Sequence, residues 1–196
     1  MIERRPKRKA APYPTARPYE SPLAGRRRRP IPDTIRRYYV PMSVLQATDH
    51  VMRQFGRQNR ECYVWWGGYF TNEAEGQVLS AIYPRARTSF GRVQLKLPTL
   101  EKMQSVLRRR DQVLLVELHT HPPGAGGQNE VDAAHPAAPY PGFISVVVPD
   151  FAFPHFYDLR ETYVYEYQGN LRWRELQRSE IEERFVIEEG AFLVRS

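Results

Sequence analysis

A chain of 196 residues is long enough for one domain with a short extension, and its 41% hydrophobic content argues against full disorder. Because no run reaches about 18 apolar residues, the sequence predicts no membrane span. A single cysteine, Cys62, excludes a disulfide framework and a cysteine-based zinc finger. The basic first residues lack the apolar stretch of a secretory signal, so we expect a cytoplasmic protein.

The net charge of +7 is unevenly distributed along the chain. Residues 1–38 hold twelve of the 29 Lys and Arg but three of the 22 acidic residues, so the remainder carries a net charge of −2. Proline is also concentrated there, and we interpret residues 1–37 as an extended or disordered basic tail. The tail is suited to nucleic acid, an anionic membrane face or an acidic protein surface, or it only adds solubility. The nearly neutral remainder is not expected to bind nucleic acid.

After the tail, the first half of the chain predicts two helices and three strands. Ser43 is expected to cap a helix that ends near Gly56, because apolar residues recur between them at helical spacing. Thr99 is expected to begin a second helix, which ends in the basic run 108–110. Aromatic-rich or alternating apolar stretches predict strands. These strands are expected over 61–70, 78–83 and 91–97.

Two β-branched apolar runs, 113–118 and 143–148, predict central strands joined by a Pro- and Gly-rich loop over 122–142. Residues 161–176 predict a hairpin that turns at Gln168-Gly169-Asn170. This order of elements predicts an α+β fold, an α/β sandwich with one mixed sheet flanked by helices, over residues 38–176. The C-terminal extension, residues 177–196, is compatible with a strand, a helix or a partner-binding segment.

The strongest functional signal is Glu117-Leu118-His119-Thr120-His121-Pro122. Side chains two positions apart on a strand point the same way, so His119 and His121 are expected to project together. Asp132, in the following loop, is the nearest acid able to act as a third ligand. Two histidines, one carboxylate and an open fourth position form a catalytic zinc site, although a His-X-His pair is also frequent by chance.

The spacing of these residues resembles the JAMM motif of the JAB/MPN metalloprotease family. In that motif His-X-His is followed by seven residues, a serine, two residues and an aspartate; here Asn129 stands at the serine position. The family also has an upstream glutamate at the start of a buried strand that runs into glycine, which Glu61 matches. The Glu-X-His-Thr-His-Pro variant resembles bacterial JAB domains. These are often associated with ubiquitin-like conjugation systems.

The resemblance implies a JAB/MPN-like fold and a zinc-dependent peptidase or isopeptidase. His119, His121 and Asp132 would hold Zn²⁺, and Glu61 would act as general base on the attacking water. Asn129 would donate to the developing oxyanion in place of the serine hydroxyl. The implied substrate is the C-terminal tail of a ubiquitin-like modifier or its conjugates, and modifier-activating or -conjugating enzymes are implied as partners.

Some assignments have alternatives. Glu117 shares a strand face with His119, and it is interpreted as a residue that orients a ligand, as the base instead of Glu61, or as an exposed acid. His135 is a spare ligand or a solvated loop residue. Because the family includes members without metal ligands that serve in protein assembly, an inactive scaffold is the second hypothesis.

Overall fold

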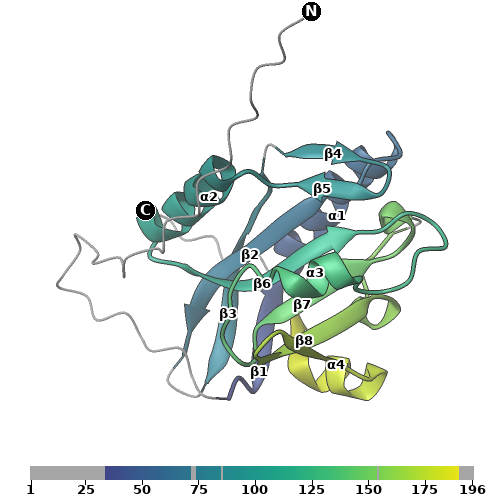
Figure 1. Cartoon of the computed structure of the whole chain (residues 1–196). Helices are drawn as coiled ribbons and strands as arrows, with labels where there is room; N and C mark the ends of the chain where they lie inside the picture. Colours follow the sequence, from purple (N-terminus) through teal and green to yellow (C-terminus); the bar gives the residue numbers. More distant parts are fainter. Residues whose placement is uncertain (1–33, 72–73, 85, 154, 190–196) are drawn as a thin grey trace, which may run out of the picture.

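The computed structural model describes residues 34–71, 74–84, 86–153 and 155–189 (Figure 1). Most of the basic tail lies outside the described residues; within 34–37, Ile35 is buried and Arg37 begins a strand. The helices are α1 (Met42–Gly56), α2 (Leu97–Arg109), α3 (Glu130–Ala134) and α4 (Arg178–Arg184), with 3-10 turns η1 (Asp150–Ala152) and η2 (Leu159–Glu161). The strands are β1 (Arg37–Pro41), β2 (Tyr63–Phe70), β3 (Glu75–Ile82), β4 (Arg87–Ser89), β5 (Arg92–Gln94), β6 (Val113–Thr120), β7 (Ile144–Val148), β8 (Tyr163–Gly169), β9 (Arg172–Glu175) and β10 (Phe185–Glu188).

Eight of these strands form one mixed sheet in the order β10-β1-β3-β2-β6-β7-β8-β9. Strand β1 pairs in parallel with β10 and β3, and β6 pairs in parallel with β7. The remaining neighbours in this sheet are antiparallel. The predicted α+β class with a mixed sheet and flanking helices is therefore confirmed, and the apolar runs at β6 and β7 are its central strands.

Helices cover both faces of this sheet (Figure 1). On one face Leu45 and Met52 of α1 join a cluster with Val116 and Leu118 of β6. On the other face Met103 and Leu107 of α2 join a second cluster, which includes Trp65 of β2 and Leu114 of β6. Because β6 carries apolar residues toward α1, its alternate positions near the C-terminal end are free to present polar side chains on the α2 face. None of the described helices is long and apolar enough to cross a bilayer.

Several predicted boundaries were wrong. Ser43 does not cap α1: the helix begins at Met42, and its N-cap is Pro41, whose extended backbone ends β1. Helix α2 begins at Leu97, before Thr99, with Lys96 as its N-cap. The strand predicted over 91–97 is limited to β5, which pairs with β4 in a separate two-stranded sheet. Its apolar side chains remain partly exposed, so no core fixes a longer strand.

Helix α3 lies inside the segment predicted as an irregular loop. The hairpin turn consists of Asn170 and Leu171, because β8 ends at Gly169, which pairs with Arg172 of β9. Asn170 and Leu171 both have positive φ values (52° and 57°), whereas the predicted turn was 168–170. The C-terminal segment contains both a helix and a strand. Strand β10 pairs with β1, and Phe185 stacks on Tyr38, so the sheet extends to Glu188.

Candidate metal centre

His119 and His121 lie at the C-terminal end of β6. His119 pairs with Tyr63 of β2 in the antiparallel register, and the His121 amide donates to the Val148 carbonyl at 2.9 Å. The backbone thus stays extended past the last strand residue, Thr120, and both imidazoles project from the same face of the sheet. Both histidines are about 95% buried. The predicted pairing of their side chains is confirmed.

Asp132 is brought to the histidines by the short helix α3. Asn129 is the N-cap of this helix, and its side-chain oxygen accepts hydrogen bonds from the Val131 and Asp132 amides at 2.8 and 3.1 Å. In return, Asp132 Oδ2 accepts from the Asn129 amide at 3.0 Å, which completes a capping box. The cap therefore fixes the position of the carboxylate that approaches the histidines.

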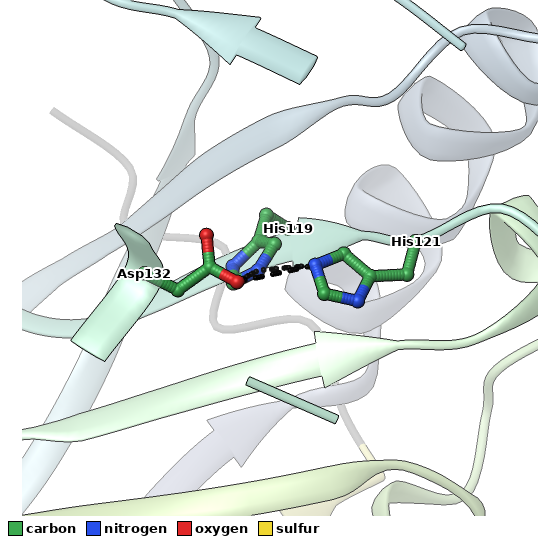
Figure 2. A group of neighbouring side chains, drawn as sticks. All are labelled: His119, His121 and Asp132. Carbon is green, nitrogen blue, oxygen red and sulfur yellow. Dashed lines mark hydrogen bonds and ion pairs between the residues drawn. The ribbon is translucent and has the colours of Figure 1, made fainter. Parts of the chain in front are cut away.

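The three side chains converge on one point (Figure 2). His119 Nε2 and His121 Nε2 are 3.2 Å apart, and Asp132 Oδ2 lies 3.4 and 3.3 Å from them. Ligand atoms held at about 2.0–2.1 Å by a tetrahedral zinc ion lie about 3.3–3.4 Å from one another. The His-His-Asp triangle already has this spacing, so the residues present fit a tetrahedral ion with one open position.

The tautomer of His121 also suits a metal ligand. Its Nδ1–H donates to the Gly126 carbonyl at 2.9 Å, which leaves the Nε2 lone pair for the centre of the triangle. Burial opposes ionisation of Asp132, yet the neighbouring His119 and His121 side chains and the Asn129 backbone amide hold the pKa of its carboxyl well below the usual range. Asp132 is therefore ionised at neutral pH, as a metal ligand must be.

Glu61 lies beside this triangle. It precedes β2, and Cys62 ties it to the site: the Cys62 amide donates to Thr120 Oγ1 at 2.8 Å, and the Thr120 amide donates to the Cys62 carbonyl. Burial raises the pKa of Glu61 to about 7, partly offset by the charges of His121 and His119. A carboxylate whose pKa lies near neutrality suits general-base chemistry.

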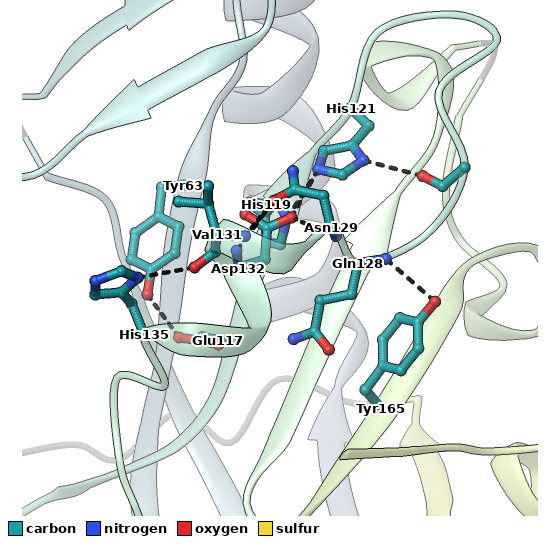
Figure 3. Close-up of polar contacts among 11 residues, drawn as sticks. Tyr63, Glu117, His119, His121, Gln128, Asn129, Val131, Asp132, His135 and Tyr165 are labelled. Carbon is teal, nitrogen blue, oxygen red and sulfur yellow. Dashed lines mark hydrogen bonds and ion pairs between the residues drawn. The ribbon is translucent and has the colours of Figure 1, made fainter. Parts of the chain in front are cut away.

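Glu117 has a different environment from Glu61. Its carboxylate accepts a hydrogen bond from the Tyr63 hydroxyl at 2.7 Å (Figure 3). It also accepts one from the Ala137 backbone amide at 3.2 Å. It is buried, and burial raises its pKa. Glu117 thus joins β6, β2 and the segment after α3. Of its three alternatives, the exposed strand-end acid was wrong, and the ligand-orienting residue and the base stay predictions.

The remaining histidines and Cys62 lie outside the triangle. His135 ends α3, with its Nδ1 2.9 Å from the Val131 carbonyl. His155 contacts Asp49 of α1, and His50 is exposed on the same helix. Burial raises the pKa of the Cys62 thiol to about 12, so this thiol is a small buried side chain and not a nucleophile.

Two residues that hold the site were not identified from the sequence. Thr120 bonds Cys62 and so places Glu61, and Gly126 accepts the His121 Nδ1–H. Thr120 stands between the two histidines, where its side chain faces the opposite side of the strand. The alternation of side chains along the strand could therefore have identified Thr120 from the sequence. In contrast, nothing in the local sequence indicates which loop carbonyl accepts the hydrogen bond of His121.

One similar protein carries the name of a metalloprotease. The chain is 26% identical over 148 residues to "Probable metalloprotease y4jG" of Sinorhizobium fredii (strain NBRC 101917 / NGR234). The matched region covers 74% of this chain and 90% of that protein. No protein-family model matches the chain.

Solved structures show the fold alone. Protein DSY2949 from Desulfitobacterium hafniense has a TM-score of 0.53 and 12% identity, covering 79% of this chain and 95% of that one. A protein from Salinibacter ruber (strain DSM 13855) has a TM-score of 0.47 and 16% identity, covering 71% of this chain and 88% of that one. The mixed α+β fold is therefore similar to that of protein DSY2949.

Proposed function

We propose that the chain is a zinc-dependent peptidase or isopeptidase of the JAMM type, with a JAB/MPN-like fold. The observation that carries the proposal is the spacing of 3.2–3.4 Å among His119 Nε2, His121 Nε2 and Asp132 Oδ2, which suits tetrahedral zinc. These three residues would hold the ion. A zinc ion held there supplies Lewis acidity that polarises a carbonyl group and makes a water molecule acidic near pH 7.

Glu61 would move the proton in this reaction. Its carboxylate accepts a proton from the attacking water and then donates it to the leaving amine, which becomes a neutral product. Its raised pKa suits both steps, because a carboxylate with a pKa far below neutrality would be a weak base and a poor acid at pH 7. Thr120, through Cys62, keeps this side chain beside the histidines.

Asn129 would stabilise the oxyanion that forms when water attacks the carbonyl. Its side-chain oxygen is engaged in capping α3, so the amide nitrogen is the end of the side chain available as a donor. This division of roles explains how an asparagine can stand where the family motif has serine. Both residue types cap helices well, and both carry a donor.

We propose as substrate the extended C-terminal tail of a ubiquitin-like modifier, either in a precursor or in a conjugate. The support for this substrate is the resemblance of the Glu-X-His-Thr-His-Pro segment to bacterial JAB domains. Modifier-activating or -conjugating enzymes are the corresponding partners.

The test combines metal analysis with a cleavage assay. Purified wild type should contain one zinc per chain by elemental analysis and should cleave a ubiquitin-like protein extended by a short peptide at its C-terminus. Prolonged dialysis against a chelator should abolish cleavage, and added zinc should restore it. A wild type without zinc and without cleavage would instead favour the scaffold hypothesis.

The Asn129→Asp variant separates the two roles of Asn129. Aspartate caps helices as well as asparagine does, so α3 and zinc content should persist. The variant loses the amide donor and gains a charge that repels an oxyanion, so kcat should fall by about 10²- to 10³-fold in the cleavage assay. Asn129→Ser, which restores the residue of the motif, is the control. Equal activity of Asn129→Asp and wild type would contradict the oxyanion role.

A further inference from the structure

The loop that joins the second histidine to the aspartate rests on strand β8. The backbone amide of Gln128 donates a hydrogen bond to the Tyr165 hydroxyl at 3.1 Å (Figure 3). The two residues are 37 positions apart in the sequence. Two residues earlier, the Gly126 carbonyl accepts the His121 Nδ1–H, and one residue later Asn129 caps α3. The loop therefore contacts Tyr165 through Gln128. This residue lies between Gly126, which is bonded to His121, and Asn129, which caps the helix that carries Asp132.

Gly127 lies directly over the tyrosines of β8. A Cβ atom at this position would lie 1.9 Å from the Tyr165 hydroxyl and 3.1 Å from Cγ of Tyr163. Residues 163 and 165 share one face of the strand, so together they form a surface that only a glycine can approach this closely. We call Tyr165 and Gly127 the loop seat.

The Tyr165 hydroxyl is the acceptor in its contact with the loop. Its oxygen accepts the hydrogen bond of the Gln128 backbone amide, so its own proton is directed elsewhere. Glu175 of the neighbouring strand β9 stands opposite Tyr165 in the register. Burial raises the pKa of Tyr165, which keeps the hydroxyl neutral at physiological pH.

We propose that Tyr165 is a positioning residue for the metal centre. By holding Gln128 it fixes the Gly126 carbonyl that orients His121 and the start of the helix that presents Asp132. The loop seat thereby sets the distance between His121 Nε2 and Asp132 Oδ2, 3.3 Å in the structure, before any ion binds. The inference rests on the proposed zinc site. It adds a residue that affects zinc affinity from strand β8, which carries none of the three ligands.

The Tyr165→Phe variant tests the role of the hydroxyl. Loss of one hydrogen bond that preorganises the ligands should weaken zinc affinity by about 3- to 10-fold, measured by competition with a chromogenic chelator. Tyr163→Phe is the matched control, because the Tyr163 atom nearest to a Cβ placed on Gly127 is Cγ and not the hydroxyl oxygen. Melting temperatures of the zinc-free proteins show whether either change only destabilises the fold.

A double-variant cycle gives a second readout. Gly127→Ala should weaken zinc affinity more than Tyr165→Phe does, since the new methyl group meets the hydroxyl. Adding Tyr165→Phe should recover part of that loss, because it removes the closest atom. Wild-type affinity in Tyr165→Phe, or purely additive losses in the double variant, would overturn the inference while leaving a zinc-binding wild type intact. A wild type that binds no zinc would overturn the proposed function itself.

Discussion

The Glu61→Gln variant should retain one zinc per chain and lose about 10²- to 10⁴-fold in kcat/KM for the modifier-fusion substrate. Glutamine has nearly the same shape as glutamate, so the buried side chain can stay beside the histidines, but its amide cannot take a proton from water. Elemental analysis and the cleavage assay on one preparation give both values. Full activity in this variant would show that Glu61 is not the base.

Glu117→Gln is the matched control for this experiment. Glu117 is also a buried acid near His119, but its carboxylate accepts from the Tyr63 hydroxyl and the Ala137 amide. A glutamine oxygen can accept both bonds, so this variant should keep most of the activity. If Glu117→Gln lost activity and Glu61→Gln kept it, the base would be Glu117, the alternative that the sequence left open.

The raised pKa of Glu61 also predicts how the zinc-free protein responds to pH. Its carboxyl binds a proton up to about pH 7 in the folded chain but only to about pH 4.5 when unfolded. The folded state therefore holds more protons in this interval, and the free energy of unfolding should fall as pH rises through it. The zinc-free Glu61→Gln variant should not show this decline. It should therefore be more stable than zinc-free wild type by about 2–3 kcal/mol at pH 8, and about equally stable at pH 4. Urea titrations of chelator-treated protein at both pH values measure the difference.

Strand alternation was sufficient to predict half of the candidate site. His119 and His121 face one side of β6 because residues two apart on a strand share a face, and the alternating apolar residues Val116 and Leu118 pack toward α1 on the opposite side. The third ligand was harder to place. Asn129 and Asp132 have the spacing of a capping box, yet the surrounding Pro- and Gly-rich segment favoured an irregular loop. The five-residue helix α3 follows from that local pattern.

Long-range pairing accounts for the features that the sequence did not predict. Strand β1 sits in the sheet between β3 and β10, at the end of a Pro- and Arg-rich segment with no strand pattern of its own. It becomes a strand because Tyr38 and Val40 are buried between two parallel neighbours. In the same way, the contact of Gly127 with Tyr165 depends on how β8 lies beside the loop, which no local pattern contains.

The Asp132→Ala variant should bind zinc about 10²- to 10³-fold more weakly than wild type. In the proposed site Asp132 would supply one of three ligand atoms and the only formal negative charge among them, so its removal would leave two imidazoles to hold a dication. Zinc stoichiometry after gel filtration, followed by chelator competition, measures the loss. Glu130→Ala, an exposed acid in the same helical turn, is the control and should bind zinc as wild type does.

A second substitution separates the loss of a ligand from the loss of the helix. Asp132 also accepts the Asn129 amide in the capping box, so Asp132→Ala weakens α3 as well as the metal site. Asp132→Asn keeps an oxygen that can accept this bond but removes the charge, so zinc binding should still fall sharply while the melting temperature of the zinc-free protein stays closer to wild type. Stoichiometric, tightly held zinc in both variants would mean that the ion is bound elsewhere. Zinc lost from Asp132→Ala alone would mean that Asp132 acts through the cap and not as a ligand.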